Sequence, residues 1–389
     1  MLAPMASVPT ALVLGAGVMG LSAAWALARA GWAVRVVEQD PIPNPRGASV
    51  DHHRVIRHAY GAQAGYMRMV DHAYVAWEAV WRDLGERFHH PTGVLAYGGA
   101  GPGWLADSRT ALDADGHAVE DLDAAGLAER WPMLSPAGIG AAFHMARGGV
   151  LLAERIVATL AVHLNRRGVE IALGRAVAVD PERALLRLAD GAEHRADLLV
   201  VAAGPWAPLL VPGLAPRVTA SRQILVLLEP PPRWQRAWEG APVILDLSEE
   251  GGFYAVPPVA GTPLKIGDHR FSLAGDAERD PRDVAAQEAA AIVALARRRL
   301  VEADAYRILA ARACYYDVEE RERFVVEPLG PRAFVMSGFS GHGFKFGPLL
   351  GLALARAAGD REAAAALPAW AAGEAPPPPA LLAALEKAA

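Results

Sequence analysis

The sequence predicts an α/β protein in which one domain, with a parallel sheet, is interleaved with an α+β domain built on a mostly antiparallel sheet. Three observations lead to this prediction. A glycine-rich turn joins an apolar strand to a helix near the N-terminus, the strand-and-turn pattern returns twice later in the chain, and less regular segments separate these pieces. A chain of 389 residues, 53% of them hydrophobic, has room for two domains with a large core.

The first piece is a β-α-β unit of about 30 residues, which is the form that a parallel sheet requires. Its elements are a buried strand over Ala11–Leu14, a turn over Gly15–Gly20, a helix over Leu21–Ala30 that ends at Gly31, and a second strand over Ala33–Val37. Further along the chain, Tyr66–Leu84 has the apolar spacing of an amphipathic helix.

The later pieces repeat this alternation of helix, strand and glycine turn. The predicted elements are a helix over Leu151–Arg167, strands at 169–173 and 183–188, a core strand over Asp197–Gly204, a strand, turn and helix over Phe334–Gly359, and a short last helix over Ala380–Ala389. The first domain would therefore comprise 8–84, 150–215 and 325–372, the second 85–149 and 216–324, and the tail 373–389. Ligands in such folds bind at the carboxyl ends of the strands, where the domains meet.

The turn after the first strand matches the dinucleotide-binding fingerprint. Gly15 permits a tight turn, Gly17 lets the backbone approach a pyrophosphate, and Gly20 lets the helix pack closely on the strand. The helix N-terminus offers N–H groups and a positive dipole end to the phosphates. Glu38, at the end of the second strand, can accept hydrogen bonds from ribose hydroxyls and disfavours a 2′-phosphate. The pattern predicts a Rossmann-type domain that binds FAD or NAD rather than NADP.

Composition and charge exclude several other classes of protein. A net charge of −5 gives no basic footprint for nucleic acid, and the apolar stretches are too short or too charged to span a membrane. Met1–Thr10 lacks the features of a secretory signal, and the single cysteine excludes an internal disulfide, so we expect a cytoplasmic protein.

The histidine pairs at 52–53 and 89–90 point apart, so we expect no metal site. The absence of a Gly-x-Ser-x-Gly motif argues against a hydrolase.

A second glycine-rich motif runs from Gly338 to Pro348. Pro348 suits the first turn of a helix, where its missing N–H would have no partner, and the preceding glycines let the backbone close on a flat ligand. The N-terminus of such a helix, aimed at a flavin, would stabilise the negative charge of the reduced ring. Lys345 is placed to meet a carboxylate, although a loop lysine of this kind is more commonly a solvated one.

These motifs resemble those of monomeric sarcosine oxidase, N-methyltryptophan oxidase and pipecolate oxidase, within the D-amino-acid-oxidase-like FAD-dependent oxidoreductases. The similarity runs nearly end to end. It rests on Gly15–Gly20, Arg54–Tyr60, Lys265–His269, Cys314 and Gly338–Gly347. The segments Arg54–Tyr60 and Gly338–Gly347 are specific to this subfamily, whereas the nucleotide fingerprint is shared much more widely.

The resemblance implies that the cofactor is FAD, attached covalently through Cys314 to the flavin 8α carbon. Glu38 stands where relatives have the ribose-binding acid. The glycine turns would contribute the remaining cofactor-binding residues, namely Gly15, Gly17, Gly20, Gly204, Gly341, His342, Gly343 and Phe344.

The resemblance also implies roles around the substrate. Arg57 and Lys345 match the pair that binds the substrate carboxylate, a task suited to a guanidinium fork and an ammonium group. Lys265 matches the lysine near flavin N5 that activates oxygen. The remaining matches are Arg54, over the flavin face, and Tyr254 and His269, which line the substrate pocket.

The implied activity is the oxidation of a small amino acid with a secondary amine, by hydride transfer to flavin N5, with reoxidation by O2 that gives hydrogen peroxide. His53 and Asp317 depart from the family pattern, and residues 216–250 carry no readable motif. The substrate therefore stays open among sarcosine, other N-methyl amino acids, cyclic imino acids such as pipecolate, and primary amines.

We expect a monomer whose partners are the amino acid and O2. Rival interpretations are a flavin dehydrogenase that uses a quinone or other carrier, an NAD-dependent dehydrogenase or imine reductase, and a non-catalytic flavin-binding protein.

Overall fold

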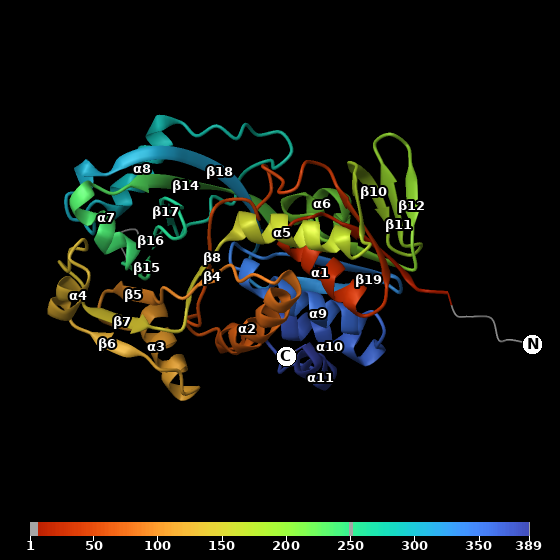
Figure 1. Ribbon diagram of the computed structural model, residues 1–389, viewed down its shortest axis with the longest axis horizontal. Helices are drawn as coiled ribbons and strands as arrows, with labels where there is room; N and C mark the ends of the chain where they lie inside the picture. The colour runs from red at the N-terminus through yellow and green to blue at the C-terminus, as the bar shows by residue number, and fades with distance from the viewer. Residues whose placement is uncertain (1–6, 249–251, 389) are drawn as a thin grey trace, which may run out of the picture.

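Two large sheets organise the computed structural model, which describes residues 7–248 and 252–388 (Figure 1). The first sheet has six strands, in the order β19 (Val325–Gly330), β20 (Ala333–Ser337), β13 (Leu198–Val201), β1 (Thr10–Leu14), β2 (Ala33–Glu38) and β9 (Glu170–Leu173). All neighbours pair in parallel except β19 and β20. The sheet thus joins strands from the start, middle and end of the chain.

The six-stranded sheet is covered on both faces, which explains why its central strands β1, β13 and β20 are largely apolar. Ala11 and Val13 belong to the core shared with helices α1 (Val18–Arg29), α5 (Ala153–Arg166) and α9 (Gly347–Ala357). Leu12 and Leu14 alternate to the other face, toward a three-stranded sheet and a short helix. These covering elements are β10 (Ala176–Asp180), β11 (Leu185–Leu188), β12 (Glu193–Arg195) and α6 (Ala207–Leu210).

The second large sheet has eight strands and lies on the other side of the molecule (Figure 1). Its order is β18 (Arg307–Glu319), β14 (Val218–Glu229), β17 (Leu264–Asp268), β16 (Phe253–Val256), β15 (Val243–Asp246), β5 (Val94–Gly98), β7 (Ala141–Met145) and β6 (Glu120–Leu122). Only β15 and β5 pair in parallel. One face packs on a core that includes α4 (Ala124–Arg130), α7 (Pro232–Glu239) and α8 (Ala286–Ala296).

The alternation of residues along β17 determines which of them lie on the opposite face of this sheet. Leu264 and Ile266 are fully buried in the core beneath α8, so Lys265 and Gly267 project from the other face. Lys265 stands opposite Leu227 of β14 and Val256 of β16. A lysine with a buried amine is therefore held by strands on both sides.

The remaining elements connect the two sheets. A small sheet joins β3 (Arg54–Ile56), β8 (Gly149–Leu151) and β4 (His89–His90). The other helices are α2 (Ala64–Leu84), α3 (Trp104–Ala114), α10 (Arg361–Ala371) and α11 (Pro379–Ala388), with short 3₁₀ turns η1 (Gly204–Trp206), η2 (Pro212–Leu214), η3 (Ala303–Ala305) and η4 (Phe344–Phe346). Among the described helices, none is both long and apolar enough to cross a membrane.

The predicted fold class, a Rossmann-type α/β domain with a second, mostly antiparallel sheet, is confirmed. Two helix starts were wrong. α1 begins at Val18 rather than Leu21, because Gly17 already caps it and Gly20 lies inside the helix. α5 begins at Ala153 rather than Leu151, because residues 149–151 form β8 and pair with β3 and β4. The exact domain limits stay a prediction. Residues 1–6 of the segment examined for a secretory signal, and Ala389 of the predicted last helix, lie outside the described residues.

Candidate active site

A cleft opens at the carboxyl ends of β1, β2 and β13, where the fingerprint turn meets the second glycine motif. Most of the predicted cofactor-binding residues line it, namely Gly15, Gly17, Glu38, Gly204, Gly341, Gly343 and Phe344. Gly20 lies behind this wall. The chain therefore brings segments near residues 15, 204 and 341 together at one place, as the sequence predicted.

The glycines of the fingerprint turn allow the tight turn that a dinucleotide needs, because a Cβ at position 15 or 20 would clash with neighbouring backbone. Gly15 has φ +103°, and a Cβ on it would lie 2.3 Å from the carbonyl oxygen of Ala202. A Cβ on Gly20 would lie 1.8 Å from the carbonyl oxygen of Gly15. Gly17 caps α1 without any side chain of its own. The turn thus presents bare backbone and a helix N-terminus to the cleft, as a pyrophosphate requires.

Glu38 is buried at the end of β2 and oriented by the backbone around it. Its Oε2 accepts from the N–H of Ala16 at 2.7 Å, and its Oε1 accepts from the N–H of Gln39 and from Asn44 Nδ2, both at 2.9 Å. The carboxylate therefore bridges the fingerprint turn and the segment after β2. This is the position from which it would accept hydrogen bonds from a ribose.

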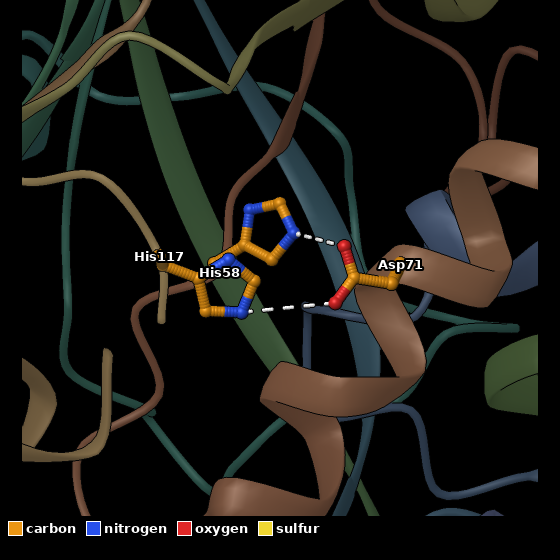
Figure 2. Close-up of side chains that lie close together, drawn as sticks. All are labelled: His58, Asp71 and His117. Atoms are coloured by element: carbon orange, nitrogen blue, oxygen red, sulfur yellow. Dashed lines mark hydrogen bonds and ion pairs between the residues drawn. The ribbon is translucent and has the colours of Figure 1, made fainter. Parts of the chain in front are cut away.

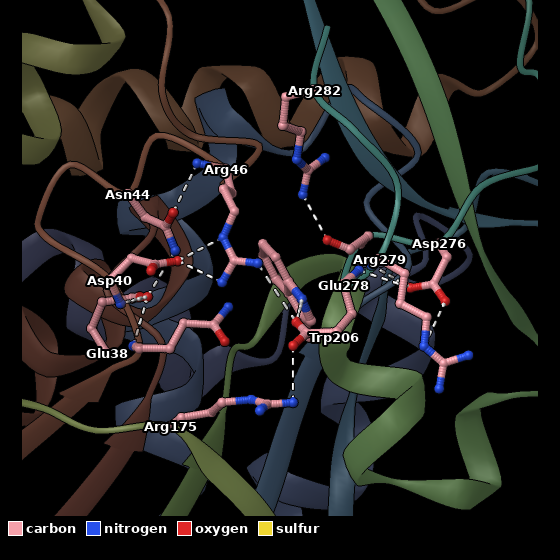
Figure 3. Close-up of polar contacts among 12 residues, drawn as sticks. Glu38, Asp40, Asn44, Arg46, Arg175, Trp206, Asp276, Glu278, Arg279 and Arg282 are labelled. Carbon is pink, nitrogen blue, oxygen red and sulfur yellow. Dashed lines mark hydrogen bonds and ion pairs between the residues drawn. The ribbon is translucent and has the colours of Figure 1, made fainter.

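Charged residues from both sheets meet at the mouth of this cleft (Figure 3). Glu278, in the segment between β17 and α8, lies 2.9 Å from Arg175 Nη2 and accepts at 2.9 Å from Trp206 Nε1. Arg46 lies over the Trp206 ring, 5.4 Å from its centroid, and pairs with Asp40 at 2.8 Å. The segment that follows β17 therefore reaches across to the end of the cleft at which Arg46 and Trp206 lie.

A second cavity continues from the first and opens between the eight-stranded sheet and the segments 54–63 and 340–345. Four residues line both cavities, namely Arg54, Tyr316, Gly341 and Phe344. The predicted residues that line only the second are Arg57, Tyr254, Lys265, His269, Cys314, His342 and Lys345. A ligand that fills the first cavity would therefore enter the second at the place where the predicted chemistry lies.

Two cations gather around Tyr60 in the second cavity. Lys345 Nζ donates to Tyr60 Oη and to the carbonyl oxygen of His342, both at 2.7 Å. The Arg57 guanidinium lies 4.8 Å from the centre of the Tyr60 ring and 5.3 Å from that of Trp104, and donates to the carbonyl of Ala59. Within the described ranges, neither cation forms an ion pair with a carboxylate. The cavity therefore offers an anion two basic side chains that form no ion pair within the described part of the chain, although Glu322 on the same cavity wall acts on Arg57 through its charge.

Burial shapes the protonation of this group. Burial, followed by repulsion from Arg57, holds the pKa of Lys345 well below its usual range. Burial and the charge of Lys345 likewise lower the pKa of His342, so its imidazole is neutral at pH 7. A bound carboxylate would reverse the shift on Lys345 by favouring the ammonium form. The ammonium form of Lys345 is therefore most favoured when the cavity holds an anion.

The other predicted cation, Lys265, is paired. Its Nζ donates at 2.6 Å to Asp51 Oδ2 and at 2.6 Å to the carbonyl oxygen of His53. Arg54 Nη1 donates to the same Asp51 oxygen at 2.8 Å. Burial would raise the pKa of Asp51, but the charges of Lys265 and Arg54 outweigh burial and lower it. Burial lowers the pKa of Lys265, although Asp51 opposes this shift.

The remaining predicted residues surround this group. Cys314 faces Gln223 in the β14–β18 ladder and is buried; burial raises its thiol pKa, while Arg54 and Lys265 lower it. The Tyr254 and His269 rings lie 5.9 Å apart on the cavity wall. Burial lowers the pKa of His269, and its Nε2 lies 3.1 Å from the carbonyl oxygen of Asp246.

Sequence reasoning missed Asp51 and Tyr60 as parts of the site. Asp51 has φ +112°, a conformation that side chains rarely adopt and that often marks functional sites. Tyr60 lay inside the recognised Arg54–Tyr60 segment, but only the structure brings its hydroxyl to Lys345. No local pattern indicates that Asp51 meets Lys265, because 214 residues separate them.

The fold and these contiguous cavities are those of a protein with a Rossmann-type site for a dinucleotide and a second cavity beside it. The model of the family described as DAO, FAD dependent oxidoreductase, matches residues 10–357, and the chain belongs to this family. It is therefore an FAD-dependent oxidoreductase, and the glycine turn, Glu38 and the cleft fit that cofactor.

Curated relatives include the N-methyl-L-tryptophan oxidases of Yersinia pestis (strain Pestoides F) and Yersinia pseudotuberculosis serotype O:1b (strain IP 31758). Each is 26% identical over 357 residues, which cover 90% of this chain and 95% of the relative. Similar solved structures include fructosamine oxidase (Amadoriase II) from Aspergillus fumigatus, with a TM-score of 0.78, 20% identity and coverage of 97% and 89%. A variant of the amino acid oxidase NikD has a TM-score of 0.78, 18% identity and coverage of 91% and 94%. These structures share the fold.

Proposed function

We propose that the chain is an oxidase of a small amino acid with a secondary amine, such as sarcosine, another N-methyl amino acid or a cyclic imino acid such as pipecolate. The observation that carries this proposal is the pair of basic side chains, Arg57 and Lys345, that lie beside the cofactor cleft without an ion-pair partner among the described residues. A carboxylate bound between them would gain two charge-assisted contacts. When bound, FAD supplies the acceptor for the two electrons of C–N oxidation.

In this proposal the protein contributes mainly position and charge. Arg57 and Lys345 bind the carboxylate and so direct the amine toward the boundary with the first cavity, where Arg54 and Tyr316 lie. Tyr254 and His269 line the cavity and limit the size of the side chain. Lys265 holds a cation on the same sheet face, where it would stabilise negative charge that develops during oxygen reduction.

The relatives support an amine substrate and add fructosyl amines to the candidate substrates. The names of the Yersinia enzymes specify an N-methyl amino acid, and that of Amadoriase II specifies a fructosamine. Both are secondary amines. The second candidate function is a dehydrogenase that passes electrons to a quinone or another carrier. One observation favours it: Asp51 neutralises part of the charge of Lys265.

For the cofactor, we propose a thioether between Cys314 Sγ and the flavin 8α carbon, because this thiol lines the second cavity beside the shared residue Arg54. The presence of a single cysteine favours a reducing compartment, so we propose a cytoplasmic protein. We also propose that it acts as a monomer.

A peroxide-coupled screen of sarcosine, N-methyl-L-tryptophan, pipecolate, a fructosyl amino acid and matched primary amines tests the function. Each compound is also mixed with the holoenzyme without oxygen, and loss of the yellow colour is recorded. We expect bleaching and peroxide with at least one secondary amine. Bleaching without peroxide would identify the dehydrogenase, and no bleaching by any amine would contradict the proposal.

A further inference from the structure

Two histidines and an aspartate converge outside both cavities (Figure 2). His58 follows β3, Asp71 lies on α2, and His117 lies in the loop after α3. Three segments that are distant in sequence thus present one imidazole, one carboxylate and a second imidazole to the same point. His58 is buried, whereas Asp71 and His117 are partly exposed, so an ion could reach the group from solvent.

The separations suit a metal ion. His58 Nε2 lies 3.2 Å from Asp71 Oδ1, His117 Nε2 lies 3.7 Å from Asp71 Oδ2, and the three ligand atoms lie within 4.8 Å of one another. Ligands at the usual zinc distances would stand about 3.4 Å apart in a tetrahedral site. Small rotations of the partly exposed Asp71 and His117 side chains would therefore be enough to bring the ligand atoms to these distances.

A supporting partner for the carboxylate is present. Arg147 Nη1 donates to Asp71 Oδ1 at 2.5 Å, while its guanidinium lies 4.7 Å from the Tyr74 ring centre. Carboxylates that bind metals are commonly held by such an outer hydrogen bond. Because Asp71 Oδ2 points toward His117, the carboxylate can keep Arg147 on one oxygen and offer the other to an ion. Asp115, which also acts on His117, adds negative charge nearby.

We infer that His58, Asp71 and His117 form a structural site for a divalent transition-metal ion of the zinc type, with water completing the shell. Imidazole nitrogen and carboxylate oxygen are ligands that Zn²⁺ accepts. The ion ties α2 to the loop after α3 and to the segment that carries Arg57, the residue next to His58. This inference departs from the expectation from sequence that the chain has no metal site, and the experiment below decides between the two.

The test uses tag-free holoenzyme that has been dialysed against EDTA and titrated with Zn²⁺ alone, by calorimetry and elemental analysis. We expect one Zn²⁺ per chain in the wild type and in the control His163→Ala, whose histidine lies on α5 outside the cluster. His117→Ala and Asp71→Asn should each weaken binding at least tenfold. An unchanged flavin spectrum verifies that the variants fold.

Co²⁺ provides a second readout, because its visible bands at wavelengths beyond the flavin absorption report direct nitrogen ligation. We expect these bands in the wild type and in His163→Ala, and their loss in His117→Ala. Failure of the wild type to bind Zn²⁺ stoichiometrically, or binding by Asp71→Asn and His117→Ala that is as tight as that of the wild type, would overturn the inference. Neither result depends on which amine, if any, the enzyme oxidises.

Discussion

Lys265 Nζ lies 2.6 Å from Asp51 Oδ2, and this buried ion pair joins the face of the eight-stranded sheet to the segment before β3. Arg54 shares the same carboxylate oxygen at 2.8 Å. One anion therefore compensates two cations, and the group keeps a net positive charge beside the boundary of the two cavities. Asp51 thus both holds Lys265 in place and limits the charge that it presents.

Replacement of Asp51 by asparagine should destabilise the protein, because it leaves two buried cations without their anion. Breaking a buried pair costs about 3–5 kcal/mol of unfolding free energy. Since the folded pKa of Asp51 is lowered, its contribution is present above the usual value of 3.8 and is lost as pH falls through the lower folded pKa. Urea denaturation over a pH series measures this difference. Asp40→Asn, which breaks a more exposed pair with Arg46, is the control, and an equal loss in both would contradict the prediction.

Lys265→Met should separate the two half-reactions. Oxidation of a neutral amine depends weakly on a nearby cation, whereas oxygen reduction begins by building negative charge that the ammonium would stabilise. We expect anaerobic bleaching to stay largely intact and reoxidation by air to slow at least about a hundredfold, which corresponds to roughly 2.7 kcal/mol. Stopped-flow absorbance follows both steps. If both slow equally, Lys265 positions the substrate; if neither slows, oxygen is not activated here.

Cys314→Ser should release the cofactor from its covalent bond without emptying the cleft, because the glycine turn and Glu38 are unchanged. Acid-precipitated wild-type protein should stay yellow and carry the mass of one FAD. The variant should lose its flavin to the supernatant under the same treatment. Complete release of flavin from the wild type would refute the covalent bond and leave the proposed oxidase activity untouched.

Carboxylate binding should weaken as pH rises, because Lys345 binds an anion as the ammonium and its pKa is lowered by burial and by Arg57. Above that lowered pKa the dissociation constant should rise about tenfold per pH unit. Acetate, which has no amine to titrate, can be followed through its effect on flavin absorbance up to about pH 10. Lys345→Met should bind weakly with a flat profile. A flat profile in the wild type would show that Lys345 does not titrate against the ligand.

The parts of the fold set by local pattern were predictable. The strand, glycine turn and helix at residues 11–30 follow from glycine geometry and apolar periodicity, which act over a few residues. The strands β14 and β18 were not recognised within the mixed pattern of residues 216–324. One face of each lines the cavity, so the sequence there carries Gln223 and Cys314 where a simple apolar alternation would be expected.

The site was predictable where single residues matched known motifs, as with Arg57, Lys265 and Lys345. Their partners were not, because Asp51 and Lys265 lie 214 positions apart in the sequence and meet only in the folded chain. The His58–Asp71–His117 group was missed for the same reason. Adjacent histidines drew attention in the sequence, whereas the convergent ones come from separate segments.

The central claim is that Arg57 and Lys345 recognise the carboxylate of an amino acid during C–N oxidation. The most direct measurement is anaerobic bleaching by the best substrate of the screen and by the matching amine without its carboxylate, in the wild type, Arg57→Ala and Lys345→Ala. Each lost contact should cost about 1.5–3 kcal/mol, or roughly 10- to 150-fold in binding of the acid. The account predicts that the wild type strongly prefers the acid and that each variant loses much of this preference. Equal bleaching by acid and amine in the wild type, or an unchanged preference in both variants, would contradict it.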